Sequence, residues 1–180
     1  MMSKPMLSVI IPIYNADKFI ERTINNIQEQ SFEDYEIICV NDCSTDNTLE
    51  TLYKIAENNP RLVLVNNIEN LGAGLSRNAG FDLSRGKYIL FLDADDEIIN
   101  NNMFGEMVSE LERGQYDFVK GLFVFSQNGK EVQIRNYANH FSSARVSISN
   151  KYKLLLSPPS LWVCMISKRF ILENNIRFNS

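Results

Sequence analysis

The segment Tyr88-Ile89-Leu90-Phe91-Leu92-Asp93-Ala94-Asp95-Asp96 joins a short apolar run to three closely spaced carboxylates. The apolar run predicts a buried strand, and the aspartates follow where that strand reaches the surface. Like charges crowded at one point repel each other unless something positive occupies the site. Carboxylate oxygens suit Mg²⁺ or Mn²⁺, so the segment predicts a divalent-cation site that would also take the phosphates of a nucleotide. The competing interpretation is an acidic loop that caps the next helix.

Short β-branched runs alternate with segments of helical spacing over the first two thirds of the chain. The expected strands are 7–11, 37–40, 62–65 and 87–92, and the expected helices begin near residue 16, near residue 44 and at residue 74. This order predicts an α/β fold with a mostly parallel central sheet flanked by helices. Because Asn15, Asp42 and Asp93 each follow the carboxyl end of an expected strand, we expect them to meet in one crevice.

The pattern changes after Gly114. An Asn128-Gly129 pair between two apolar runs is typical of a β-hairpin and predicts an antiparallel edge on the sheet. The spacing of the apolar residues from Met103 to Leu111 favours a core helix. The expected elements beyond it are strands at 117–125 and 131–137, a final strand at 162–166 and a helix at 168–174.

Composition narrows the class of protein. A chain of 180 residues with 44% hydrophobic content has enough material for one core, so one domain is expected. The 18 basic and 22 acidic side chains give a net charge of -4 with no basic stripe, which argues against nucleic acid as a partner. Cys39, Cys43 and Cys164 have no disulfide or zinc spacing, which favours a reducing cytoplasm.

No apolar segment approaches the roughly 20 residues of a membrane-spanning helix. The first apolar run, 7–11, is closed by Pro12, too early for the core of a signal peptide. We therefore expect a cytoplasmic protein whose contact with a membrane, if it has one, is peripheral and on the cytoplasmic face.

Two further motifs lie at strand-to-helix turns. In the segment 42–48, Ser44 or Thr45 is expected to cap a helix, whereas Asp42 is free to accept hydrogen bonds from a nucleobase or a ribose. In the segment 70–80, Arg77 stands where a dinucleotide fingerprint needs its third glycine, so that fold is not indicated. Arg77 is instead expected to reach a diphosphate, and the alternative is a surface ion pair.

Taken together, four ordered motifs resemble the inverting family 2 glycosyltransferases of GT-A fold. They are Ser8-Val9-Ile10-Ile11-Pro12-Ile13-Tyr14-Asn15, the segment 41–48, the segment 70–80 and Phe91-Leu92-Asp93-Ala94-Asp95-Asp96. The match is clear over residues 6–115, the expected nucleotide-sugar-binding half. Residues 116–180 would begin the acceptor half of the same glycosyltransferase domain.

The resemblance implies transfer from a nucleotide-sugar donor, with a UDP-sugar first among the candidates, to a glycan or lipid-linked acceptor. It also implies Mg²⁺ or Mn²⁺ and inversion at the anomeric carbon. The implied donor-site residues are Pro12 and Tyr14 in the base pocket with Asn15 beside them, Asp42 on the base, Arg77 near the diphosphate, Asp93 on the ribose and Asp95 on the metal.

The chain departs from the family pattern in three places. Cys43 stands where the family often has glycine, and Asn41 where it often has aspartate. The family's general base is an acidic residue downstream of a segment like 169–178, and the last acid here, Glu173, comes too early. We therefore expect the general base beyond Ser180, in a longer transferase of which this chain is the donor-binding part, truncated or naturally short.

Two other functions remain open from the sequence. One is a nucleotide-sugar-binding module without catalysis. The other is a metal-dependent phosphatase or nucleotidyltransferase of similar layout. A haloacid-type phosphatase loop is less well matched, because that loop normally follows the first strand and carries Thr or Val where Glu97 stands.

Overall fold

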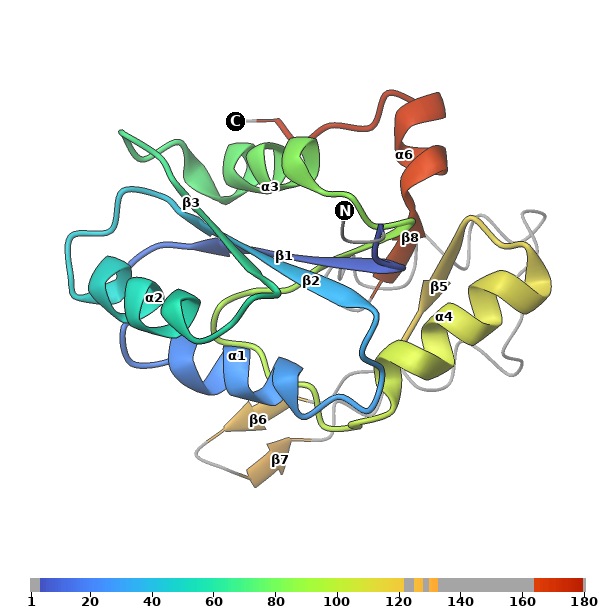
Figure 1. Cartoon of the computed structure of the whole chain (residues 1–180), viewed down its shortest axis with the longest axis horizontal. Helices are drawn as coiled ribbons and strands as arrows, with labels where there is room; N and C mark the ends of the chain where they lie inside the picture. Colours follow the sequence, from blue (N-terminus) through green and yellow to red (C-terminus); the bar gives the residue numbers. More distant parts are fainter. Residues whose placement is uncertain (1–3, 122–124, 128–129, 133–163, 180) are drawn as a thin grey trace.

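A six-stranded, mostly parallel sheet organises the chain in the computed structural model, which describes residues 4–121, 125–127, 130–132 and 164–179 (Figure 1). Its strands, in spatial order, are β3 (Leu62–Asn66), β2 (Tyr35–Asn41), β1 (Leu7–Ile13), β4 (Tyr88–Phe91), β8 (Cys164–Ser167) and β5 (Phe118–Lys120). The first four are parallel, and β8 runs antiparallel between β4 and β5. The predicted α/β fold with an antiparallel edge is confirmed.

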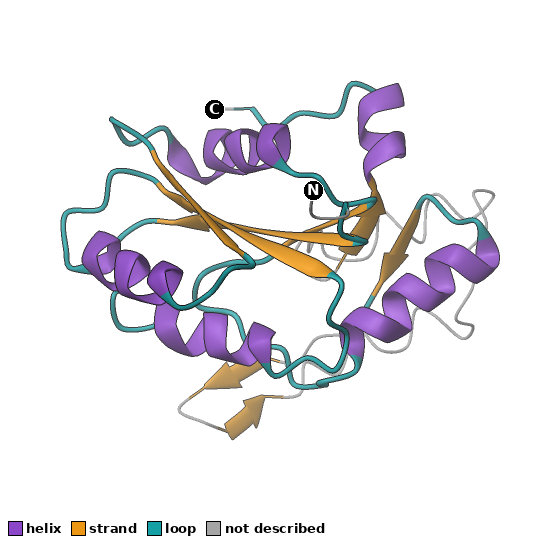
Figure 2. Ribbon diagram, viewed as in Figure 1, coloured by secondary structure: helices purple, strands orange, loops and turns teal. Residues whose placement is uncertain are grey.

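Helices cover both faces of this sheet, which makes three layers (Figure 2). One face carries α1 (Ile20–Gln28), α2 (Thr48–Glu57) and α4 (Met103–Gly114), and the other carries α3 (Gly72–Leu83) and α6 (Lys168–Glu173). Each face has its own cluster of buried apolar residues. Because β1 and β2 are buried on both sides, their sequences are continuous apolar runs rather than alternating ones.

Pro12 does not end β1, as the sequence suggested, because the strand continues to Ile13. In this strand Ile13 O accepts from the N–H of Asp42 on the β2 side, and Ile10 O accepts from the N–H of Leu92 on the β4 side. Pro12 lies two residues after Ile10 and therefore also faces β4. Pairing with β4 stops at Ile10, so the missing N–H of Pro12 removes no hydrogen bond from the sheet.

The expected strand 117–125 is wrong as a single element. The structure divides it into β5, which pairs with β8 in the main sheet, and β6 (Phe125–Gln127). β6 pairs antiparallel with β7 (Lys130–Val132), as the hairpin pattern predicts, although residues 128–129 between them lie outside the described residues. Most of the expected strand 131–137, and residues 162–163 of the expected final strand, also lie outside them.

The first two helices begin later than expected, because polar side chains hold the preceding loops. Ala16 O accepts from the N–H groups of Phe19 and Ile20, which makes a turn before α1 starts at Ile20. Ser44 and Thr45 do not cap α2, which starts at Thr48. The third helix, α3, begins two residues earlier than expected, at Gly72.

The described helices include none that is long and apolar enough to cross a membrane.

Close packing of α3 against the sheet gives a first prediction. A Cβ at Gly80 would lie 2.4 Å from Cγ2 of Ile10, a stiff side chain in the central strand, and 3.2 Å from Cγ2 of Val40. We expect Gly80→Ala to lower the free energy of unfolding by about 1–3 kcal/mol, measured by urea denaturation.

The matched control is Gly105→Ala in α4, where the nearest atom to the new Cβ would be Phe32 Cβ at 3.8 Å. That substitution should raise stability by about 0.5–1 kcal/mol, because alanine restricts the unfolded chain more than glycine does. Equal effects of the two substitutions would contradict the packing argument.

Candidate functional site

The three aspartates form a tight turn directly after β4. The strand ends at Phe91, and the turn is closed by a hydrogen bond from the N–H of Asp96 to Asp93 O at 3.2 Å. Asp95 is exposed, whereas Asp93 and Asp96 are half-buried. Since β4 lies beside β1, this turn shares one edge of the sheet with the loops that follow β1 and β2.

Asp96 shows the electrostatic cost of this arrangement. Burial, then the charges of Asp93 and Asp95, raise its pKa to about 6 from the ordinary value of 3.8. Its Oδ2 atom is buried and has no hydrogen-bond partner. Within the described ranges, no ion pair involves Asp95 or Asp96. Negative charge at this turn is therefore only partly balanced by the protein.

The turn fits an open divalent-cation site better than a closed one. The described part of the chain contains no group of three or more His, Cys, Asp or Glu side chains arranged to hold a metal. Mg²⁺ and Mn²⁺ commonly bind one or two carboxylates and complete their coordination with water and substrate phosphates. Asp95 is accessible for that role, and the partnerless oxygen of Asp96 lies within the same turn.

Arg77 is the cation that contacts this turn. It extends from α3, and its Nη2 lies 2.5 Å from Oδ1 of Asp93. The guanidinium is largely buried, with 18% of its side chain exposed, and its Nε has no hydrogen-bond partner. Arg77 thus forms an ion pair, which was one of its two expected roles. The other role, binding a diphosphate, is still open to it, because an ion-paired arginine at this edge has further donors that a diphosphate would satisfy.

A segment near the end of the chain, residues 176–179, supports Arg77 from the other side. The ring of Phe178 lies 5.5 Å from the Arg77 guanidinium and packs edge-on against Phe91 of β4. The Asn78 side chain donates to Phe178 O at 2.9 Å and accepts from the N–H of Phe178 at 3.1 Å. The sequence did not single out Asn78 or Phe178, because residues one hundred positions apart carry no local pattern.

Asp42 is 2% exposed, and backbone groups occupy most of its carboxylate. Its Oδ1 accepts from the N–H of Leu71 at 3.0 Å and from the Asn67 side chain at 2.7 Å, and its Oδ2 accepts from the N–H of Gly72 at 2.8 Å. Asp42 thus tethers the start of α3 to the end of β2. The sequence predicted a nucleobase contact and missed this structural role.

The loops after β1 and β2 are joined by a reciprocal pair of hydrogen bonds. The N–H of Asn15 donates to Ser44 Oγ at 3.0 Å, and the N–H of Thr45 donates to Asn15 Oδ1 at 2.8 Å. Asn15 and Cys43 have positive φ angles of 51° and 58°. The glycine that the family often has at position 43 would adopt this left-handed backbone conformation freely, whereas Cys43 adopts it against the steric preference of an L side chain.

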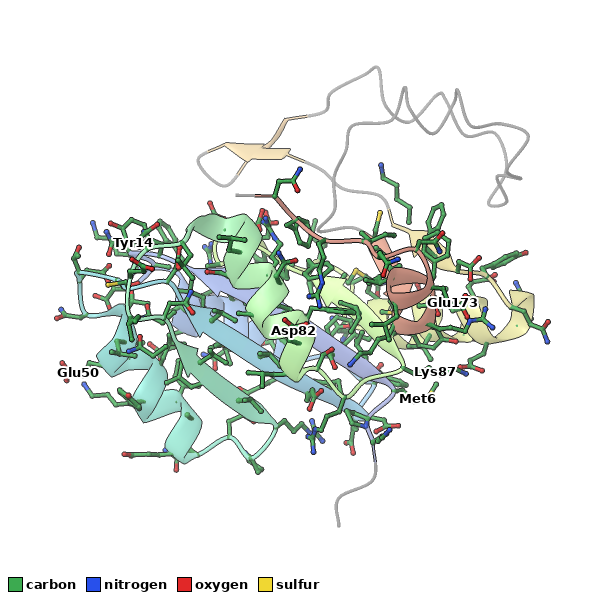
Figure 3. The ribbon with its side chains drawn as sticks, turned by 90° about the horizontal axis from the view of Figure 1, so that it is seen from above. Met6, Tyr14, Glu50, Asp82, Lys87 and Glu173 are labelled. Carbon is green, nitrogen blue, oxygen red and sulfur yellow. The ribbon has the colours of Figure 1, made fainter. Side chains whose placement is uncertain are left out.

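Three further residues considered from the sequence are Tyr14, Pro12 and Glu173. They differ in whether they lie near the carboxyl ends of the parallel strands. Tyr14 is 51% exposed at the end of β1, and Pro12 is buried within that strand. Glu173, the last acid of the sequence, lies in α6 far from Tyr14 (Figure 3). The reason is that β8 runs antiparallel to β4 and delivers α6 near Tyr88, at the start of β4 rather than at its end.

Known proteins resemble this chain over most of its length. The sequence model of the family described as "Glycosyl transferase family 2" matches residues 8–174. A Campylobacter jejuni GalNAc(5)-diNAcBac-PP-undecaprenol beta-1,3-glucosyltransferase is 30% identical over 179 residues, which cover 97% of this chain and 55% of that protein. The matched part of the chain spans between 26% and 55% of the length of the curated relatives.

Two solved structures share the GT-A fold. S. aureus TarS 1-349 in complex with UDP-GlcNAc has a TM-score of 0.79 and 27% identity, with 96% of this chain and 48% of that chain covered. Mannosyltransferase PcManGT from Pyrobaculum calidifontis, in complex with GDP-Man and Mn²⁺, has a TM-score of 0.70 and 22% identity, with 98% and 48% covered. The second likeness concerns the fold alone.

The tether made by Asp42 gives a prediction about stability and pH. Burial alone would raise the pKa of Asp42, but hydrogen bonds from Leu71, Asn67, Ser76 and Gly72 outweigh burial, and the pKa lies below the ordinary value of 3.8. The charged form therefore stabilises the fold above pH 3.8, and this contribution is lost as the pH falls through the folded-state pKa.

We expect Asp42→Asn to lower the free energy of unfolding by about 1–3 kcal/mol at neutral pH, and the difference from wild type to shrink below pH 3.8. Urea denaturation over a pH series measures both. Asp34→Asn is the control, because Asp34 is exposed and its carboxylate has no hydrogen bond within the described ranges. A difference between wild type and Asp42→Asn that does not depend on pH would contradict the tether.

Proposed function

The chain belongs to glycosyl transferase family 2, and from this premise we propose that it binds the donor in an inverting, metal-dependent transferase. The donor is a nucleotide-sugar, with UDP-sugars the first candidates, and the acceptor is a glycan or a lipid-linked glycan. One observation carries the proposal. Asp93, Asp95 and Asp96 crowd one turn, and the protein supplies a single cationic partner there, Arg77, within the described residues.

The turn suits the diphosphate of such a donor. A divalent cation, when bound, would act as a Lewis acid toward the leaving nucleoside diphosphate. Asp95 would hold that cation, and the free lone pairs of Asp96 lie in the same turn. Arg77 would orient the diphosphate with its forked donors while its bond to Asp93 keeps the guanidinium in place.

The loops after β1 and β2 suit the nucleoside. The exposed ring of Tyr14 is available for stacking on a base, and Pro12 supports it from within β1. Asp42 would accept from a base imide N–H with a carboxylate lone pair that its four hydrogen bonds leave unused. Asn15 would hold the loop that carries Tyr14, and Asp93 would contact the ribose.

We propose that the general base is none of the acids placed in this donor site. Inverting transfer needs a base that takes the proton of the acceptor hydroxyl as it attacks. Glu173 lies at the opposite end of β4 and is within 3.9 Å of Arg169, so it does not face the donor site. The base would then belong to the acceptor half that begins at residue 116, beyond Ser180.

We further propose a cytoplasmic location, where nucleotide-sugars would be available to the chain. Cys39, Cys43 and Cys164 form no disulfide within the described part of the chain, which is consistent with a reducing compartment.

Calorimetric titration tests the donor site. We expect UDP to bind wild type more tightly with Mn²⁺ than with EDTA, and Asp95→Asn to remove most of that difference, because it removes the ligand charge. Metal-ligand losses of this kind cost about 10–100-fold in affinity. The control is Glu97→Gln, an exposed acid two residues away that should leave the Mn²⁺ effect intact. Equal metal dependence in wild type and Asp95→Asn would contradict the assignment.

Incubation with candidate donors tests transfer itself. UDP-, GDP- and dTDP-sugars are offered with Mn²⁺ and a lipid-linked glycan acceptor, and the products are identified by mass spectrometry. Glycosyl transfer establishes an enzyme, and donor binding without transfer establishes a binding module. When a phosphate monoester, or a nucleoside triphosphate with a sugar phosphate, is offered in place of the nucleotide-sugar, release of inorganic phosphate or pyrophosphate would contradict both and favour a phosphatase or nucleotidyltransferase.

A further inference from the structure

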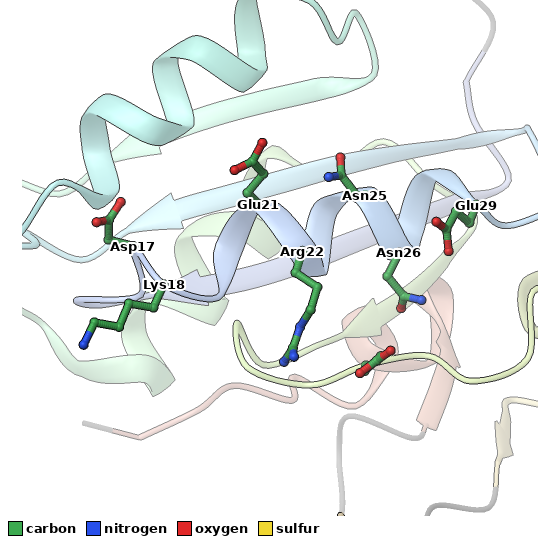
Figure 4. Close-up of a pocket in the computed structure, with 8 residues that line it drawn as sticks. Asp17, Lys18, Glu21, Arg22, Asn25, Asn26 and Glu29 are labelled. Atoms are coloured by element: carbon green, nitrogen blue, oxygen red, sulfur yellow. The ribbon is translucent and has the colours of Figure 1, made fainter. Parts of the chain in front are cut away.

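The segment after the aspartate turn follows α1 without forming a helix or strand. Residues 92–102 lack regular secondary structure until α4 begins at Met103. Buried backbone N–H and C=O groups must find partners elsewhere when no helix or sheet supplies them. In this segment the partners are side chains of α1 (Figure 4), where Asn26 points toward the loop that follows β4.

Three side chains make these contacts in order along the segment, Thr23 and Asn26 from α1 and Gln30 from two residues after its end. Thr23 Oγ1 donates to Ala94 O at 2.7 Å. Asn26 donates to Ile98 O at 2.9 Å and accepts from the N–H of Ile98 at 2.6 Å. Gln30 donates to Asn100 O at 2.9 Å and accepts from the N–H of Phe104 at 3.1 Å.

Thr23 and Asn26 lie on one side of α1, since residues three apart are neighbours on a helix, and Gln30 follows two residues after the helix ends. This polar stripe lies beside the apolar stripe formed by Ile20, Ile24 and Ile27. Thr23 and Gln30 are 1% and 5% exposed. Buried polar groups cost free energy unless they are hydrogen-bonded, so the stripe is stable only with the segment lying against it.

Thr23 acts at the point closest to the carboxylates. Ala94 lies between Asp93 and Asp95, and its carbonyl is held by the Thr23 hydroxyl. That carbonyl belongs to the peptide that joins Ala94 to Asp95. Fixing the plane of this peptide limits the directions in which the Asp95 carboxylate can point.

The far end of the segment is anchored in another way. Phe104 is fully buried in the core, and Ile98 is 6% exposed. Apolar packing therefore holds the segment from Ile98 onward. Between Phe91 and Ile98, the Thr23 hydrogen bond is the side-chain hydrogen bond described between the aspartate turn and α1, and Leu92 and Ala94 also pack against the core that α1 helps to form.

We propose that Thr23 is a positioning residue for the cation site, which it orients through the backbone of Ala94. The inference rests on the proposed function, because it assigns a role in holding the cation that Asp95 would bind. Asn26 continues the same role one helical turn later, where it fixes the course of the segment.

The test compares Thr23→Val, which keeps the shape but removes the donor, with Thr23→Ser, which keeps the donor. Asn25→Ala is the control, because Asn25 is exposed on α1 and its side chain has no hydrogen bond in the described part of the chain. Mn²⁺ binding without nucleotide is followed by the EPR signal of free Mn²⁺. UDP binding with Mn²⁺ or EDTA is followed by calorimetry, and thermal unfolding is recorded for each variant.

We expect Thr23→Val to weaken Mn²⁺ binding about tenfold and to leave UDP affinity in EDTA unchanged. Thr23→Ser should recover Mn²⁺ affinity to within about twofold, and Asn25→Ala should match wild type. Amide exchange of residues 93–97 should also accelerate in Thr23→Val. If Thr23→Val does not fold, Asn26→Ala, at a half-buried position, is expected to weaken Mn²⁺ binding in the same direction.

If Thr23→Val folds and binds Mn²⁺ as tightly as wild type, and only its unfolding temperature is lower, the inference is overturned. Thr23 would then have a structural role alone. Absence of Mn²⁺ binding in wild type would also overturn it. Failure of wild type to bind UDP while Mn²⁺ binds would contradict the proposed donor site, and the Mn²⁺ titration would still test Thr23.

Discussion

Repulsion among three carboxylates at the end of a buried strand is the constraint on which the site depends. Asp93, Asp95 and Asp96 are held within one turn, and burial with mutual repulsion raises the pKa of Asp96 to about 6. The surrounding protein compensates in two ways. Arg77 supplies a positive charge on one side. On the other side, the Thr23 hydroxyl of α1 donates a hydrogen bond to the backbone carbonyl of Ala94. The parts of α1 and α3 that meet this turn therefore carry polar side chains, where packing alone would favour apolar ones.

The layout of the fold could be predicted from the sequence because it depends on long apolar runs. β1, β2 and β4 are buried on both faces, so their sequences mark them plainly. The starts of α1 and α2 could not be predicted, because they depend on which hydrogen bonds the polar groups of the preceding loops form. Ser44 has the chemistry of a helix cap, but its hydroxyl accepts from Asn15, twenty-nine residues away.

The candidate site was predictable residue by residue but not in its connections. The motifs indicated Asp42, Arg77 and Asp93, and the structure brings them to one edge of the sheet. The buried tether from Asp42 to α3 and the packing of Phe178 on Arg77 depend on contacts between distant segments. Polar spacing at Thr23, Asn26 and Gln30 was visible in the sequence, but its partner could be identified only once the segment after β4 was placed.

A second buried acid differs from the aspartate turn in how fully its carboxylate is hydrogen-bonded. Glu36 is 3% exposed near the opposite edge of the sheet. One of its oxygens accepts from the Ser8 hydroxyl and the N–H of Arg85, and the other accepts from the Arg85 guanidinium. Every partner that a carboxylate needs is present there, as expected of a group that only stabilises the fold. Asp96 has the same chemistry and comparable crowding, yet one oxygen is left without a partner. The same chain thus provides hydrogen-bond partners for both oxygens of one buried carboxylate and leaves one oxygen of another without a partner. The carboxylate without its full set of partners belongs to Asp96, in the turn that follows β4.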